Sequence, residues 1–164
     1  MKTNTKIFVI SLSWLMCASL VTAQDDKEKM AIKACIERET KAFFETDYKT
    51  WIDSWAHTPY AYWSVSDTTG VSTYEGWKAI EIGFNDYFVT SKPSSAKIER
   101  KWHEIRVYGQ GAYARFVQYT TEDRVTVVQD ELRILEKQNN QWKIVLVGVM
   151  QGMKKNKLTP IDTR

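Results

Sequence analysis

The first half of the chain carries apolar residues at the spacing of amphipathic helices. From Asp25 to Thr46, apolar positions recur three and four residues apart among charged residues, which predicts one long helix. Asp47 is suited to cap a short second helix, because an Asp side chain accepts hydrogen bonds from the free amides of a first turn. Trp51 and Trp55 are four residues apart, so they lie on one face of that second helix.

An aromatic strand and a third helix are predicted next. The second helix cannot continue past Pro59, and the aromatic residues over 60–65 favour a strand. Residues 66–74 contain a glycine and many hydroxyl side chains, which predicts a loop or a weak hairpin. A third helix is predicted over residues 75–90, where apolar side chains again recur on one face.

After Pro93 the period of the pattern changes from helical to two. Four long strands are predicted, over residues 97–108, 112–121, 124–136 and 142–151. The short connections between them contain Gly, Asp and Asn, which is typical of hairpins, so the sheet is expected to be mainly antiparallel. A helical block followed by such a meander predicts an α+β fold, with three N-terminal helices packed on one concave face of a curved sheet.

The first 23 residues have the layout of a removable signal peptide. Lys2 and Lys6 precede an apolar run over residues 7–20, and small residues end the segment. The run is shorter than the roughly 20 residues that a membrane span needs. We therefore expect a periplasmic or secreted protein with no stable membrane span after cleavage.

Loss of residues 1–23 changes the charge and the cysteine content. It removes two of the 23 basic residues and none of the 20 acidic ones, which leaves a net charge of +1 and argues against nucleic-acid binding. Cys35 remains as the single cysteine, so no disulfide forms within the chain, and a buried side chain is predicted. One domain over residues 24–151 and a polar tail over residues 152–164 are expected.

Three segments together resemble a known superfamily. WIDSWA (51–56) ends the second predicted helix, YEGWKAI (74–80) opens the third, and ELRILEK (131–137) leads into WKIV (142–145). In these segments and in its order of elements, the chain is similar to the SnoaL-like branch of the nuclear-transport-factor-2-like superfamily, over about residues 28–151. The resemblance implies a cone-shaped, cystatin-like roll whose open end holds a small apolar ligand. Members include isomerases, dehydratases, polyketide cyclases, epoxide hydrolases and non-catalytic modules.

The resemblance also bears on a catalytic base. Steroid-isomerase-like members carry a general-base Asp in the first strand, and the matching position here falls near Trp63. An indole nitrogen only donates hydrogen bonds, which argues against that activity unless a carboxylate such as Asp67 has moved into the role. Asp67 is therefore one candidate catalytic residue.

The two histidines have separate interpretations. His57 is the second candidate catalytic base. The interpretation that we favour is structural: its imidazole forms hydrogen bonds with backbone carbonyls at a helix-to-strand corner. His103 is expected to share a strand face with Ile105 in a surface or interface role. Two histidines so far apart do not make a catalytic metal site, so neither a metal nor a cofactor is expected.

Polar side chains interrupt the apolar faces of the later strands and are candidate ligand contacts. Glu131 and Arg133 share one face of a strand, and Arg115 and Tyr119 share a face of the preceding strand. Two interpretations are open. The groups line a cavity and orient a polar ligand atom, or Glu131 and Arg133 pair with each other on the outer face of the sheet, which we favour.

Aromatic side chains are abundant in the elements that would bound the cone. Those assigned to the ligand are Tyr62, Trp63, Trp77 and Phe84. Aromatic lining suits a small apolar or aromatic ligand, although aromatic residues at helical spacing more often form ordinary core.

The final predicted strand is apolar on both faces. Ile144 and Leu146 alternate with Val145 and Val147, so both faces need cover. Helices cover one face and a second copy of the chain would cover the other, which predicts a homodimer. Three functions stay open: an exported small-molecule-binding domain, which we favour, a cofactor-free lyase, isomerase or hydrolase, and a dimeric interaction module with a vestigial pocket.

Overall fold

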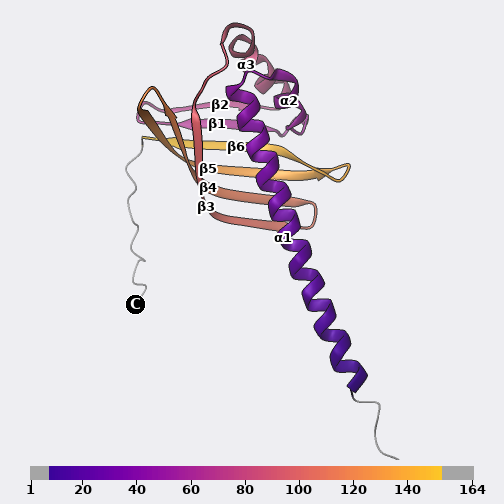
Figure 1. Ribbon diagram of the computed structural model, residues 1–164. Helices are drawn as coiled ribbons and strands as arrows, with labels where there is room; N and C mark the ends of the chain where they lie inside the picture. The colour runs from indigo at the N-terminus through magenta and orange to yellow at the C-terminus, as the bar shows by residue number, and fades with distance from the viewer. Residues whose placement is uncertain (1–7, 153–164) are drawn as a thin grey trace, which may run out of the picture.

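Three helices pack against one curved, six-stranded sheet, which is the predicted α+β architecture (Figure 1). The computed structural model describes residues 8–152, with side chains for residues 24–152. The elements are α1 (Phe8–Phe44), α2 (Tyr48–Asp53), β1 (Tyr62–Ser66), β2 (Val71–Glu75), α3 (Trp77–Thr90), β3 (Lys97–Tyr108), β4 (Gly111–Glu122), β5 (Val125–Gln138) and β6 (Gln141–Gln151).

The predicted signal peptide and polar tail fall at the ends of the described part. Residues 1–7 and 153–164 lie outside it, and residues 8–23 form the N-terminal part of α1. This helix is longer than the one predicted from Asp25 to Thr46, because no glycine or proline interrupts it. Its N-terminal end projects beyond the sheet (Figure 1). Among the residues whose side chains are described, no helix is long and apolar enough to cross a membrane.

The six strands form one mixed sheet in the order β2-β1-β6-β5-β4-β3. Strands β3 to β6 pair antiparallel as a meander, whereas β1 pairs antiparallel with β2 and parallel with β6. The β5–β6 turn uses two residues with positive φ, Asn139 at 50° and Asn140 at 61°, as a two-residue hairpin turn requires. The predicted meander and its hairpin connections are confirmed.

The helices cover the concave face of the sheet. Helix α1 crosses this face, and α2 and α3 lie at the end formed by β1 and β2 (Figure 1). Asp47 caps α2 as predicted, and its Oδ1 accepts a hydrogen bond of 3.1 Å from the amide of Thr50. Gly83 lets α3 lie close to β2, because a Cβ there would meet the ring of Tyr74 at 2.4 Å.

Cys35 is buried on the sheet-facing side of α1, as predicted. Its Sγ donates to the carbonyl oxygen of Trp142 at 3.1 Å. Burial raises the pKa of this thiol to about 11, so the thiolate is scarce at neutral pH and the residue acts as a small core side chain.

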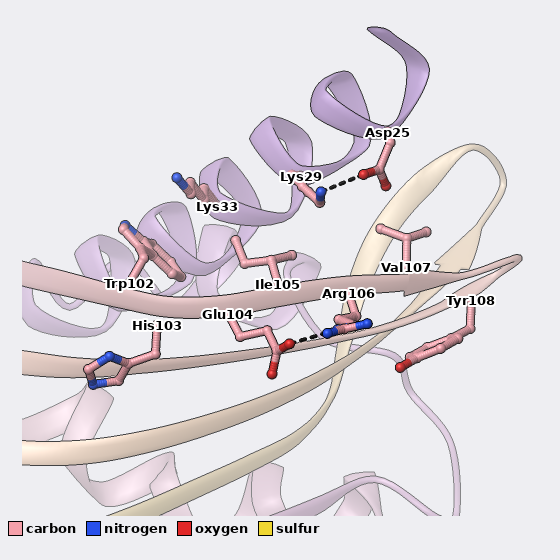
Figure 2. Close-up of a pocket in the computed structure, with 10 residues that line it drawn as sticks. All are labelled: Asp25, Lys29, Lys33, Trp102, His103, Glu104, Ile105, Arg106, Val107 and Tyr108. Atoms are coloured by element: carbon pink, nitrogen blue, oxygen red, sulfur yellow. Dashed lines mark hydrogen bonds and ion pairs between the residues drawn. The ribbon is translucent and has the colours of Figure 1, made fainter. Parts of the chain in front are cut away.

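A β-bulge in β3 changes the predicted direction of several side chains. The pairing of β3 with β4 shifts between Trp102 and Glu104, which leaves His103 as the extra residue. Trp102 and Ile105 consequently both point towards α1, while His103 and Glu104 point away from it (Figure 2). The prediction that His103 shares a face with Ile105 is therefore wrong, although His103 is exposed, as a surface role requires.

A second bulge affects β6. The pairing of β5 with β6 shifts at Leu135, and Val145 is the extra residue. Ile144 and Val147 consequently both join the core, although strict alternation had placed them on opposite faces. The outer face of β6 keeps Leu146, so this strand is apolar on both faces, as predicted.

Candidate ligand-binding cavity

A cavity of about 140 Å³ lies between the helices and the concave face of the sheet. Its aromatic lining comes from all three helices, from the segment after α2 and from β1, and consists of Phe43, Phe44, Trp51, Trp55, Trp63 and Phe84. Its polar lining comes from α1, β4 and β5, and consists of Glu39, Thr40, Gln118, Gln129, Glu131 and Arg133. The cavity thus combines apolar walls with a polar floor.

Phe84 and Trp55 show how the fold positions the walls. The ring of Phe84 on α3 packs edge-on against aromatic rings from three other elements. The ring centroids are 5.7 Å away for Phe43, 5.4 Å for Trp51 and 5.0 Å for Trp63. The segment that carries Trp55 is fixed to β6, because the amide and the carbonyl of Ile144 each form a backbone hydrogen bond of 2.8 Å to it.

Glu131 and Arg133 form a buried ion pair in the floor of the cavity. They are two residues apart on β5, and Glu131 Oε2 lies 2.6 Å from Arg133 Nη2, with each residue 4% exposed. The two residues pair with each other, as predicted, but the favoured outer-face position is wrong, since they also line the cavity. Burial raises the pKa of the Glu131 carboxyl, and the neighbouring Arg133 opposes that rise.

A second guanidinium, that of Arg100 on β3, lies next to the cavity. It lines a neighbouring opening that shares Thr40 and Phe44 with the cavity. The Cζ atoms of Arg100 and Arg133 lie 5.5 Å and 5.8 Å from the centroid of the Phe116 ring. The ring of Phe116 therefore supports both cations.

Several buried polar atoms around the cavity lack a hydrogen-bond partner among the described residues. The donors in this state are Arg133 Nε and Nη1, Arg100 Nε and Nη2, and Trp55 Nε1. Among the acceptors, Gln118 Oε1 has no hydrogen-bond partner. Glu131 Oε2 has none beyond its ion pair with Arg133. Each such group costs about 1–3 kcal/mol, so together they indicate a place where a bound molecule completes the hydrogen bonds.

A larger opening lies outside the core, between α1 and the edge strand β3 (Figure 2). Its volume is about 600 Å³, but four of its charged groups are paired with each other and Lys33 lies over the ring of Trp102. Lys29 contacts Asp25, and Arg106 Nε lies 2.7 Å from Glu104 Oε1. The smaller cavity is the better candidate site, because its polar groups are the ones without partners.

The structure divides the predicted ligand contacts into two groups. Those that line the cavity are Trp63, Phe84, Glu131 and Arg133. Three of the others are Tyr62, Arg115 and Tyr119, each next to a concave-face residue on its strand. Because side chains alternate along a strand, these three lie on the outer face and do not line this cavity. Trp77 packs behind the lining, with its ring centroid 5.8 Å from that of Trp51.

His57 and Asp67 lie outside the cavity lining. His57 Nε2 is 2.9 Å from the carbonyl oxygen of Ile52, and its ring stacks on Trp77 at 4.2 Å, in agreement with the structural interpretation. Asp67 Oδ1 accepts bonds of 2.7 Å and 2.6 Å from the amide and hydroxyl of Thr69, which lower the pKa of Asp67. In the described part of the chain, no group of three or more His, Cys, Asp or Glu residues is placed to hold a metal ion.

Four polar lining residues were not among the predicted contacts, namely Glu39, Thr40, Gln118 and Gln129, and the sequence carries a signal for Glu39 and Gln118. Glu39 lies four residues from both Cys35 and Phe43, which places its carboxylate on the buried face of α1. Its Oε1 accepts a hydrogen bond of 3.0 Å from the indole of Trp51. Gln118 follows Phe116 by two residues and so continues the concave face of β4.

The arrangement of helices and sheet is similar to several solved structures. An NTF-2-like protein of unknown function from Shewanella oneidensis has a TM-score of 0.60 at 13% identity, over 75% of this chain and 98% of that one. An NTF2-like superfamily protein from Salmonella enterica has a TM-score of 0.57 at 20% identity, over 80% and 95%. The association domain of C. elegans CaMKII has a TM-score of 0.58 at 17% identity, over 77% and 97%. No family model and no curated protein sequence matches the chain.

Proposed function

Because the chain has the nuclear-transport-factor-2-like fold, we propose that it binds a small ligand with an aromatic or apolar body in the cavity behind α1. The observation that carries this proposal is the joint presence of aromatic walls and unpartnered polar groups around one partly open cavity. The signal-peptide pattern of residues 1–23 supports binding in the periplasm or outside the cell.

The positions of the candidate bases favour binding over turnover. His57 and Asp67 are exposed and outside the cavity lining. Trp63, near the position where a steroid-isomerase-like base is expected, lines the cavity but offers only a donor. An enzyme on this scaffold would have to use one of the buried carboxylates instead.

A cavity-filling substitution tests the proposal. Val149 lines the cavity, so Val149→Phe is expected to occupy the space and abolish ligand-dependent stabilisation. A ligand at about 100 times its Kd adds about 2.7 kcal/mol to the free energy of unfolding, which a thermal shift against a library of small aromatic compounds detects. Met150→Phe is the matched control, because Met150 is the next residue on the same strand and is 48% exposed. Equal stabilisation of Val149→Phe and the unmodified protein would place binding elsewhere.

We propose in addition that the protein forms a homodimer through the outer face of the sheet. Ile134, Leu146 and Tyr62 are direct cross-strand partners on this face, and they form an apolar row across three strands. Ile134 is 37% exposed and Val128 is 48% exposed, so a second copy would bury apolar surface there. One similar structure is described as an association domain, which agrees with this proposal.

Light scattering at micromolar concentration tests the dimer. The unmodified protein is expected at twice the mass of one chain, and Ile134→Lys at the mass of one chain, because a lysine in the buried contact would be desolvated. Val89→Lys on α3 is the control, since Val89 is 75% exposed and lies away from the sheet face. A single-chain mass for the unmodified protein contradicts the proposal.

A further inference from the structure

We infer that the cavity selects a neutral, single-ring carbonyl compound, such as an aromatic ketone, aldehyde or amide, whose oxygen accepts hydrogen bonds from Arg133 and Trp55. This inference rests on the proposed function and narrows its ligand. Three properties of the cavity lead to it: an excess of unpartnered donors, a lining without a spare positive charge, and a small volume.

The unpartnered polar atoms require a ligand that accepts hydrogen bonds. Among the fully buried atoms of the cavity lining, Arg133 has two such donor nitrogens and Trp55 has one, whereas the acceptors without a hydrogen bond are Gln118 Oε1 and the ion-paired Glu131 Oε2. Arg100 adds two more donor nitrogens from the adjoining opening. A carbonyl oxygen has two lone pairs and no hydrogen, so it satisfies donors without adding one. A hydrocarbon ligand would leave every one of these groups unsatisfied.

The charges in the cavity lining disfavour a negatively charged ligand. Glu39 and Glu131 supply two carboxylates, while Arg133 supplies one guanidinium group, which lies 2.6 Å from Glu131. The adjoining opening adds Arg100, but it also carries two further glutamates and a lysine. A ligand carboxylate would therefore be buried without a counter-charge of its own, which is strongly unfavourable in a desolvated site. A neutral carbonyl compound uses the free donors and adds no negative charge.

The volume limits the part of the ligand inside the cavity to a single ring. A protein cavity of about 150 Å³ accommodates benzene. The cavity here is about 140 Å³ and partly open, so the second ring of a fused compound would have to extend out of its mouth. The ring is expected to pack against Trp63 and Phe84, whose side chains line the apolar side of the cavity.

Four probes of similar size separate the contributions in a titration calorimetry series. Acetophenone and benzamide carry a neutral carbonyl, benzoate carries a charge, and toluene has no acceptor. Acetophenone and benzamide are expected to bind at least about tenfold more tightly than toluene, because a hydrogen bond to a charged donor is among the strong ones. Benzoate is expected to bind more weakly than benzamide.

The variant Trp55→Phe tests the donor assignment directly. It removes the indole N–H but keeps an aromatic ring in the wall, so the affinity for acetophenone is expected to fall several-fold while that for toluene stays unchanged. Trp77→Phe is the matched control, because Trp77 does not line the cavity. A purely structural role for Trp55 would lower the affinities for both probes equally. Arg133 is not the first choice for this test, since its loss leaves Glu131 unpaired.

The outcomes distinguish this inference from the proposed function. If toluene binds as tightly as acetophenone, or benzoate binds most tightly, the carbonyl inference is overturned while the cavity remains a binding site. If none of the four probes binds, and none stabilises the protein thermally, the inference fails together with the proposed function. Tighter binding of the neutral carbonyl probes, reduced in Trp55→Phe alone, supports both.

Discussion

Replacement of Arg133 by leucine is expected to lower the free energy of unfolding by about 3–5 kcal/mol near neutral pH. The reason is that Glu131 would keep its carboxylate in the core without the guanidinium that now lies 2.6 Å away. Chemical denaturation followed by circular dichroism measures the loss. The double variant Glu131→Leu and Arg133→Leu is expected to recover most of it, because an apolar pair of similar size has no charge to desolvate.

The same variant has a pH dependence whose sign follows from Glu131. Its folded-state pKa lies above its ordinary value of 4.5, so its contribution to stability is fully present below that value and is lost as pH rises through the folded pKa. In Arg133→Leu the counter-charge is gone and the folded pKa rises further. The loss of stability is therefore expected to be larger at about pH 8 than at about pH 5. Equal losses at both values, without recovery in the double variant, would contradict a buried charge as the cause.

The regular elements were predictable because local spacing determines them. The four strands of the meander, the third helix and the capping role of Asp47 were all predicted from periodicity and turn chemistry. The parallel pairing of β1 with β6 was not predicted, because residues so far apart in the chain leave no periodic signal of their contact. The predicted start of the first helix at Asp25 was also wrong, because α1 continues through the apolar residues before it.

The direction of strand side chains was less predictable than the strands themselves. A single extra residue reverses every later side chain, and the bulges at His103 and Val145 have no distinguishing residue type. Glu131 and Arg133 were placed together on one face of their strand, but both faces of β5 carry apolar residues. Periodicity therefore gave the pairing of these two residues but not their position inside the cavity.

Replacement of Trp51 by alanine is expected to be the most disruptive change to the aromatic wall, lowering the free energy of unfolding by about 3–5 kcal/mol. Trp51 is 1% exposed and its ring lies within 6.0 Å of those of Trp55, Trp77, Phe84 and Phe88. Trp51→Phe keeps a ring but removes the 3.0 Å hydrogen bond to Glu39 Oε1, so a smaller loss of about 1–3 kcal/mol is expected. Denaturation followed by circular dichroism avoids the fluorescence change that a lost tryptophan causes.

Trp55→Phe is the control that separates the hydrogen bond from packing. Trp55 is 2% exposed, so the same substitution removes a comparable ring, but its indole nitrogen has no hydrogen-bond partner to lose. In the absence of ligand, Trp51→Phe is therefore expected to cost more than Trp55→Phe, by an amount that reflects the carboxylate of Glu39 left short of one donor. If the two variants are equally stable, the bond from Trp51 to Glu39 contributes nothing net, and the wall is held by packing alone.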